Sequence, residues 1–298
     1  MIRERGNAMN VRRMAALLFC LLCLPLCVLA EGRVVNLTLT PDAEYQLDDS
    51  IPLLEVWFPP VKGADACILR MGDEVMVVDA ATAGQYPRLQ KVLKDLEIER
   101  VNIGFNTHPH DDHIQGFEYM PQDVQLDQFL YTFPEDANNN MVNAMRVMKE
   151  NNIPTHRVQD GDVLKLGKAE ILVIQKTESW FSDNNRSAML LVRYGDCTLL
   201  MAADVELDGQ NLLLKTMPEM LDADILKYPH HGVDIAGWNF LKHVSPEVAV
   251  VTNGRYSVKR TRKDAEKRHL PLVYTDQGVV RLMTDGQTWV LEQFPAEE

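Results

Sequence analysis

The sequence has few cysteines, a deficit of positive charge and, beyond its first thirty residues, no long apolar run. Five of its 298 residues are cysteine, and Cys20, Cys23 and Cys27 lie within the first 30 positions. The other two, Cys67 and Cys197, lie in apolar, strand-like runs. Two cysteines are too few for a disulfide framework, so we expect two buried free thiols. There is also no internal repeat and no low-complexity tract.

Basic residues are outnumbered by acidic ones. The chain has 30 Lys and Arg against 43 Asp and Glu, a net charge of −13. Residues 1–30 carry four Arg and one Glu, so the rest has 26 basic and 42 acidic residues, a net charge of −16. Such a domain repels a nucleic-acid backbone unless positive charge is concentrated locally. We therefore expect no stable complex with nucleic acid.

Residues 1–30 have the composition of a secretory signal peptide. Four arginines within the first 13 residues precede the apolar run "MAALLFCLLCLPLCVLA", and the sequence turns polar at Glu31. This predicts a signal peptide over 1–30 and a secreted or extracytoplasmic protein. A run of about 17 residues is at the lower edge of what spans a bilayer, so tethering by an uncleaved signal is the alternative. No later stretch predicts a transmembrane segment, and the oligomeric state is left open.

Residues 31–298 predict one α/β domain in which strands outnumber helices. Apolar residues recur at helical spacing in 85–98 and 137–153, and shorter helices are predicted at 209–217 and 236–244. Short apolar runs bounded by turn residues predict strands through most of the remainder. No linker rich in Pro, Gly or Ser divides the chain.

The stretch "NTHPHDDHIQG", residues 106–116, carries the densest group of metal-ligand side chains. His108 and His110 follow a predicted strand and are two residues apart, so both can reach one ion. Asp112 and His113 are adjacent and, at the start of a helix, can face a second ion. Imidazole and carboxylate together suit zinc, and also manganese or iron. Asp111 is expected to point away or to hydrogen-bond a ligand.

Further ligands must come from elsewhere in the chain. "LKYPHHG" places His230 and His231 after a predicted strand and before a glycine. Asp204 ends the apolar strand "CTLLMAAD", where a carboxylate can bridge two ions. The remaining histidines, His156, His243 and His269, lie in charged or amphipathic surroundings and are expected to be structural or on the surface.

These motifs together resemble the metallo-β-lactamase fold. "THPHDDH" resembles the H-x-H-x-D-H signature of that family, and "KGADACILRMGDEVMVVDAA" resembles its opening strands. "NNRSAMLLVRYGDCTLLMAADVE" and "DILKYPHHG" resemble one branch, the metallo-β-lactamase-like domain of the competence protein ComEC and related free-standing hydrolases. The resemblance spans residues 53–292. It implies a four-layer αββα sandwich with mixed sheets over 31–298.

The resemblance also assigns roles by position. It implies that His108 and His110 bind the first of two divalent ions, that Asp112 and His113 bind the second, and that Asp204 bridges them. The histidine directly before the glycine matches the family's late ligand, so His231 is assigned to metal. His230 then contacts the substrate or gives a proton to the leaving group.

The sequence departs from the family between the first cluster and Asp204. A further histidine ligand is usual there, and this chain reads "SDNNRSAML". Asp183, Asn184 or Asn185 can occupy that space, and Asn184 and Asn185 are candidate substrate-binding residues. The absence weakens the first metal site.

The expected reaction is hydrolysis by a metal-activated water, with Asp112 orienting the nucleophile. The ComEC-like resemblance favours a phosphodiester or small phosphoester, or a nucleic-acid-like substrate. The basic stretch "RYSVKRTRKDAEKRH" offers Arg255 as a substrate-binding candidate, although such a stretch is more often a solvated helix face. The alternatives are a carbonyl ester, lactone or related substrate on the same two ions, or a metal-binding module without catalysis.

Overall fold

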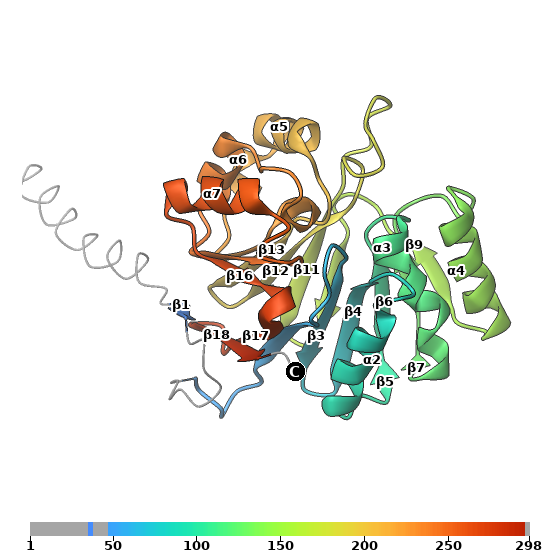
Figure 1. Ribbon diagram of the computed structural model, residues 1–298. Coiled ribbons are helices and arrows are strands. Elements are labelled where there is room, and N and C mark those ends of the chain that lie inside the picture. The colour runs from blue at the N-terminus through green and yellow to red at the C-terminus, as the bar shows by residue number, and fades with distance from the viewer. Residues whose placement is uncertain (1–34, 38–46, 296–298) are drawn as a thin grey trace, which may run out of the picture. The chain divides into compact units, whose positions relative to one another are not determined.

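The apolar runs of the sequence build two large sheets. The computed structural model describes residues 35–37 and 47–295, which belong to a unit that begins at Val35 (Figure 1). The predicted signal peptide, 1–30, lies outside these residues. In spatial order the first sheet consists of β1 (Val35–Leu37), β18 (Trp289–Pro295), β17 (Gly278–Thr284), β2 (Leu54–Phe58), β3 (Ala66–Met71), β4 (Glu74–Ala80), β6 (Ile103–Asn106), β8 (Phe129–Tyr131) and β9 (Thr155–Arg157).

The second sheet has the order β10 (Val163–Leu166), β11 (Ala169–Ile174), β12 (Met189–Tyr194), β13 (Cys197–Met201), β14 (Ile225–Lys227), β15 (Val248–Val251) and β16 (Leu272–Tyr274). Both sheets are mixed. From β18 to β4 the first sheet is antiparallel, and β4, β6, β8 and β9 are parallel. The second is antiparallel from β10 to β13 and parallel from β13 to β16. A small parallel pair joins β5 (Arg100–Val101) and β7 (Gln125–Leu126).

The two sheets pack face to face over a shared apolar core. Alternate residues of β12 show how, because Leu190 and Val192 pack with the first sheet whereas Met189 and Leu191 pack with helices on the other face. Burial on both faces explains why "AMLLV" reads as a continuous apolar run rather than an alternating one. Cys67 and Cys197 lie buried in the shared core as thiols that form no disulfide, as expected.

Helices cover the outer face of each sheet (Figure 1). On the first sheet lie α2 (Tyr86–Asp95) and α4 (Asn139–Glu150), whose buried residues pack against β3, β4 and β8. On the second lie α5 (Leu207–Thr216), α6 (Trp238–Val244) and α7 (Lys259–Arg268). The four layers confirm the predicted αββα sandwich. Along the described part of the chain, no helix has the length and apolar character needed to span a membrane.

Short helical turns fill the connections between these elements. They are α3 (Asp111–Ile114), η1 (Gln115–Glu118), η2 (Met120–Gln122), η3 (Pro218–Met220), η4 (Pro229–Gly232) and η5 (Thr275–Gln277). One boundary differs from expectation, because the strand predicted to reach His230 and His231 ends at Lys227. Pro229 has no N–H with which to continue the ladder, and both histidines instead lie in the turn η4.

Several chain segments end at one edge of the sandwich, and these ends position the candidate site. The edge is reached by β6 before Thr107, by β13 before Ala202, by β14 before Tyr228 and by β15 before Thr252. The β2–β3 connection with Asp65 reaches the same place, since Asp65 bonds to residues of these ends. Loops at the carboxyl ends of strands are common sites of ligand binding, because a rigid scaffold holds them.

Candidate metal centre

The first histidine pair follows β6 directly. His108 is fully buried, and its Nε2 lies 3.1 Å from Nδ1 of His110. His110 has an extended backbone and stands at the N-cap of α3, where Asp111 begins the helix. Its side chain therefore turns back toward His108. We call His108 and His110 the first-ion group.

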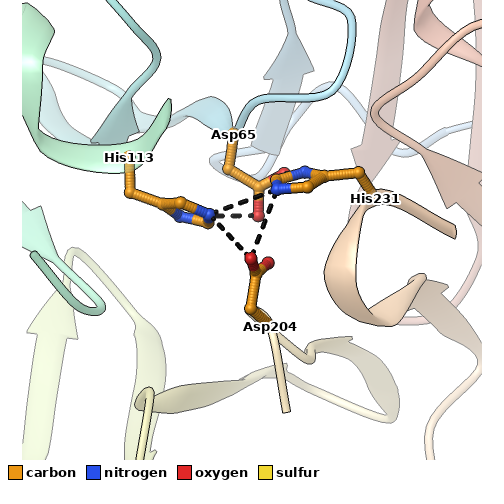
Figure 2. Close-up of side chains that lie close together, drawn as sticks. All are labelled: Asp65, His113, Asp204 and His231. Atoms are coloured by element: carbon orange, nitrogen blue, oxygen red, sulfur yellow. Dashed lines mark hydrogen bonds and ion pairs between the residues drawn. The ribbon is translucent and has the colours of Figure 1, made fainter. Parts of the chain in front are cut away.

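Asp204 lies at the centre of the histidines. Its Oδ2 lies 3.2 Å from Nε2 of His113 and 3.3 Å from Nε2 of His231 (Figure 2). The same oxygen lies 3.8 Å from Nε2 of His108 and 3.8 Å from Nε2 of His230. Four imidazoles thus surround one carboxylate oxygen that is buried beyond the end of β13. This is the geometry required of a bridging ligand.

Asp112, His113 and His231 form a second set, which we call the second-ion group. Nε2 of His231 lies 3.3 Å from Nε2 of His113 and 3.2 Å from Oδ2 of Asp112. Ligand atoms of a tetrahedral zinc site are about 3.4 Å apart when each is about 2.1 Å from the ion. His113, His231 and Asp204 therefore already have this mutual spacing. Asp112 lies beside them, 3.2 Å from Nε2 of His231 and 3.9 Å from Nε2 of His113, so these residues fit a divalent ion.

Two buried carboxylates brace the second-ion group. Asp79 lies 2.7 Å from Nδ1 of His113, and Asp65 lies 3.0 Å from Nδ1 of His231. Metal-binding histidines usually donate their other ring N–H to such a carboxylate, which aims the free nitrogen at the ion. Asp65 also falls within the group of possible ligand atoms that includes Asp204 (Figure 2). Its contact with Nδ1 rather than Nε2 marks it as a bracing residue.

The bracing carboxylates are themselves held by buried donors. Asp79 accepts hydrogen bonds from the Thr107 hydroxyl (2.6 Å) and the Thr107 amide (2.9 Å). Asp65 accepts one from the Thr252 hydroxyl and pairs with the buried ammonium of Lys227. Lys227 also donates to the Ala203 carbonyl (3.1 Å). This buried cation offsets part of the negative charge that the carboxylates concentrate here.

Sequence reasoning did not find Asp65, Asp79 or Lys227. Asp79 and Asp65 do carry a signal, because Asp79 lies within the buried apolar strand β4 and Asp65 directly precedes the buried strand β3. Lys227 carries one too, since it ends the otherwise apolar run of β14 and is 1% exposed. Ionised residues in such positions are almost never fully buried without a partner.

The buried histidines and carboxylates of the cluster shift one another's pKa values. Burial alone lowers the pKa of a histidine, but the carboxylates of Asp204 and Asp79 raise the pKa of His113 to about 10. Asp204 and Asp65 likewise raise the pKa of His231 well above its usual value. Burial raises the pKa of a carboxyl, yet His231 and His113 hold the pKa of Asp204 well below its usual value. Protons on the two histidines thus serve in place of a cation, and a divalent ion would displace them.

Two further features fit a metal site. Asp204 Oδ1 is buried without a hydrogen-bond partner among the described residues, and the Lys227 ammonium lies 3.9 Å from it. The surrounding backbone is also strained. Asp79, Ala81, Ala203, His230 and His231 all have φ between 44° and 61°. Left-handed backbone in non-glycine residues costs stability and collects at functional sites.

The first-ion group is less complete. Burial lowers the pKa of His108 well below its usual value, so the ring is neutral and available as a ligand. The groups of possible ligand atoms among the described residues include neither His108 nor His110. In the segment that lacks the usual histidine, Asn184 lies with its Nδ2 3.4 Å from Nε2 of His230. Asn184 therefore reaches the site's edge through His230.

Asn185 and Arg255 were the other substrate-binding candidates. Asn185 is buried, donates to Glu206 (2.9 Å) and accepts from the Gly209 amide (2.8 Å), so it fastens its loop to α5. Arg255 is exposed, its amide bonds Asp276, and it lines a cavity of about 360 Å³ with Arg262 and residues of β16. The structure brings neither side chain into contact with the histidines.

The basic stretch forms helix α7. Arg268 pairs with Asp264, and its guanidinium lies 4.3 Å from the ring centre of Trp238. Arg262 lies 3.7 Å from Glu266 on the same helix. Part of the positive charge of the stretch is therefore compensated within α7 itself.

A cavity of about 390 Å³ opens beside His230. Its lining combines two carboxylates, Glu206 and Asp234, with apolar residues and carries no Lys or Arg. The full lining is Val205, Glu206, Leu207, Gln210, Pro229, His230, Asp234, Ile235 and Ala236. Leu207 and Ile235 are 54% and 43% exposed, so the cavity presents apolar surface next to the metal centre.

Comparison with known proteins supports the same fold. No family model matches the chain. Over 162 residues, 53% of the chain, it is 24% identical to ComE operon protein 3 of Bacillus subtilis (strain 168). The matched region covers 20% of that protein, so the chain spans about a fifth of its length.

Solved structures give the fold directly. YhfI of Bacillus subtilis, a metallo-β-lactamase fold protein, is 12% identical with a TM-score of 0.51, covering 74% of this chain and 95% of that one. A protein of Parabacteroides distasonis ATCC 8503 assigned as a metal-dependent hydrolase is 15% identical with a TM-score of 0.50, covering 78% and 97%. The chain has the metallo-β-lactamase fold, with a cluster of Asp and His residues that can hold metal.

Proposed function

We propose that this protein is a metal-dependent hydrolase that cleaves a small phosphoester or phosphodiester. The observation that carries the proposal is the convergence of His113 and His231 on Asp204 at 3.2–3.3 Å, with Asp112 3.2 Å from His231, which is the spacing of a metal site. Two bound divalent ions, zinc in the first instance and manganese or iron as alternatives, would supply a water of lowered pKa and neutralise charge on the reacting oxygen.

The chain's own residues support this chemistry in distinct ways. Asp65 and Asp79 fix the rings of His231 and His113, so little rearrangement is needed on binding. The Asp112 side chain is 26% exposed and faces the open side of the cluster. Burial raises a carboxyl pKa, but His231 and His113 lower that of Asp112, so it is ionised at neutral pH. An ionised, accessible carboxylate can orient the attacking water and accept its proton.

The cavity beside His230 bears on the substrate. Its carboxylates repel a polyanion, and the net charge of the chain does the same. A long nucleic-acid track is therefore disfavoured, whereas a small ester with an apolar, neutral or cationic group fits. The resemblance of the sequence motifs to the ComEC-like branch favours a phosphodiester by analogy.

The cavity also favours a second candidate. With no basic residue in its lining, it suits a neutral carbonyl ester or lactone as well as a phosphoester. Both reactions would use the same cluster, and they differ in the charge of the group that must approach it.

A substrate panel separates the two. The protein is stripped of metal, reloaded with zinc or manganese, and assayed on bis-p-nitrophenyl phosphate, p-nitrophenyl phosphorylcholine, p-nitrophenyl butyrate and a lactone. We expect metal-dependent release from the phosphodiesters, with phosphorylcholine preferred because its cationic group complements Glu206 and Asp234. Turnover of carbonyl substrates alone would replace the first candidate with the second. Tight metal binding without turnover of any substrate would indicate a binding module.

We also propose export through residues 1–30. Their basic start, apolar run and polar break support this. Fractionation of expressing cells, with intact-mass measurement of the purified protein, tests it. Loss of about 30 N-terminal residues from an extracytoplasmic fraction is expected, and a full-length cytosolic product would overturn it.

A further inference from the structure

Three histidines around Asp204 share one arrangement. Each has Nδ1 on a carboxylate and Nε2 facing Oδ2 of Asp204. For His113 the two distances are 2.7 Å and 3.2 Å, with Asp79 as the carboxylate. For His231 they are 3.0 Å and 3.3 Å, with Asp65. His230 repeats the pattern, with Nδ1 2.9 Å from Asp234 and Nε2 3.8 Å from Asp204.

The backbone of η4 is built to present both neighbouring rings. Adjacent residues of a strand point to opposite faces, yet His230 and His231 both face Asp204. They do so because both have left-handed backbone, with φ of 48° and 51°. The His230 amide also donates to the carbonyl of Ala203 (2.9 Å), the residue beside Asp204. A conformation this costly in two successive residues indicates that both rings have a role.

His230 lies where the first-ion group is incomplete. His108 and His230 each place Nε2 3.8 Å from the same oxygen of Asp204. The segment that lacks the usual histidine contributes Asn184, whose Nδ2 lies 3.4 Å from Nε2 of His230. The other atom of that amide, Oδ1, is buried with no partner among the described residues. The space next to the missing ligand thus holds an imidazole nitrogen and an unsatisfied amide oxygen.

We infer that His230 binds the first divalent ion through Nε2, with His108, His110 and the bridging Asp204, and so replaces the missing histidine. This inference rests on the proposed two-ion hydrolase. It revises the role expected from the sequence, in which His230 gives a proton to the leaving group. In the inferred arrangement both histidines of "HHG" are ligands, one for each ion.

A competing arrangement places an ion outside the cluster, between Glu206, His230 and Asp234. The contacts of Glu206 argue against it. Its two oxygens already accept hydrogen bonds from Asn184 (3.0 Å), Asn185 (2.9 Å) and the Ser182 hydroxyl (3.0 Å). Nδ1 of His230 is at hydrogen-bond distance from Asp234, as in the two braced histidines.

Cobalt(II) titration of the metal-free protein tests the inference, because cobalt bands report ligand binding without any turnover. Binding is followed by calorimetry and by visible absorption for the wild type, His230→Ala, His231→Ala and Asp234→Asn. His243→Ala is the matched control, since His243 lies exposed on α6 with Nδ1 on the Asn239 carbonyl.

We expect two ions in the wild type and in His243→Ala. His230→Ala should keep the tighter ion unchanged and weaken the other about 100-fold or more, whereas His231→Ala should weaken the tighter one. Asp234→Asn should weaken the same ion as His230→Ala by about 10-fold, as loss of a bracing carboxylate does. It keeps the imidazole and serves as the test if His230→Ala does not fold.

The remaining outcomes overturn the inference in distinguishable ways. Two ions of wild-type affinity in both His230→Ala and Asp234→Asn, with only the pH profile of turnover changed, would restore the proton-donor role. A third ion in the wild type, lost in Glu206→Gln, would place His230 in the outer arrangement. Less than one tightly bound ion in the wild type would instead overturn the proposed function itself.

Discussion

The two halves of the metal centre share Asp204 but differ in how firmly their ligands are held. In the second-ion group, His113 and His231 are buried and each is braced by a buried carboxylate, Asp79 or Asp65. In the first-ion group, Nδ1 of His108 has no carboxylate partner among the described residues and lies 3.2 Å from the Thr107 hydroxyl, and His110 stands half-buried at a helix start. Preorganised ligands lose less freedom on binding, so the second ion should bind more tightly than the first.

Replacing Asp204 should have the largest effect, because it removes the oxygen that both groups share. We expect Asp204→Ala to lose both ions and to lower kcat/KM on the order of 1,000-fold. Metal analysis after dialysis, together with turnover of the best substrate, measures this. Asp208→Asn, an exposed carboxylate on α5, is the control. Full turnover by Asp204→Ala would refute the bridging role.

Removing one ligand from each group should show which of the two ions that group binds. His231→Ala should weaken the tighter ion by about 100- to 1,000-fold, since each of four ligands carries a share of the binding free energy. His108→Ala should leave that ion in place and remove the weaker one. Stepwise cobalt affinities of the two variants provide the comparison. Identical profiles would show that the two groups do not bind separate ions.

Acid should weaken the second ion more than the first. In the metal-free fold the pKa of His113 is raised from 6.5 to about 10 by Asp204 and Asp79 against the effect of burial. Its proton stabilises the metal-free protein fully below about 6.5, and that contribution is lost as pH rises through about 10. Between about pH 6.5 and about pH 10, metal must displace this proton in order to bind. Metal affinity should therefore fall up to about tenfold for each pH unit of acidification, for each proton released.

The first ion should depend less on pH, because the pKa of His108 is lowered by burial and its ring is already neutral. Calorimetry at pH 7 in buffers of different ionisation enthalpy counts the protons released at each step. If binding of the first ion released as many protons as binding of the second, the proposed difference between the two groups would be wrong.

Loss of a bracing carboxylate should have a moderate effect confined to one half. Asp79→Asn should weaken the second ion about 10- to 100-fold while leaving the first unchanged. The same stepwise titration measures it, with the exposed Asp95→Asn on α2 as the control. An equal loss at both ions would mean that Asp79 supports the whole edge of the sheet rather than one ring.

Arg255 should matter least. Its side chain is exposed beside the cavity at β16, and its contacts are made away from the histidines. We expect Arg255→Ala to change kcat/KM for a small phosphodiester by about twofold or less. A drop of tenfold or more, absent with a neutral ester, would show that the substrate's charge reaches the turn before α7.

The sequence predicts the candidate ligands of both halves but not the residues that brace them, for physical reasons. His108, His110 and His113 are neighbours in sequence, and Asp204 and His231 follow apolar strands, so local pattern alone draws attention to them. Asp65 meets Lys227 and His231 only because β3 and β14 reach the same edge from different sheets. Such long-range pairs leave no periodic signal, so the bracing residues emerge only from the fold.

The backbone conformation of η4 could not be predicted from the sequence for a related reason. Pro229 ends the strand early, but nothing in "PHHG" predicts left-handed backbone at both His230 and His231. That conformation accompanies a hydrogen bond from the His230 amide to the Ala203 carbonyl, a contact between residues far apart in sequence. The layers themselves were predictable, since β12 and β13 read as long apolar runs and α2 as an amphipathic helix.

Zinc titration of the metal-free protein, with bound metal and activity followed at each equivalent, is the most direct measure of whether two unequal ion sites share Asp204. Two zinc ions should bind with distinctly different affinities, the tighter one requiring His231 and the weaker one His108. Hydrolysis should appear as the second equivalent of zinc binds, which is the weaker ion of the first-ion group. A single ion, two ions of equal affinity, or full activity in the metal-free protein would contradict the account of a shared carboxylate between unequal halves.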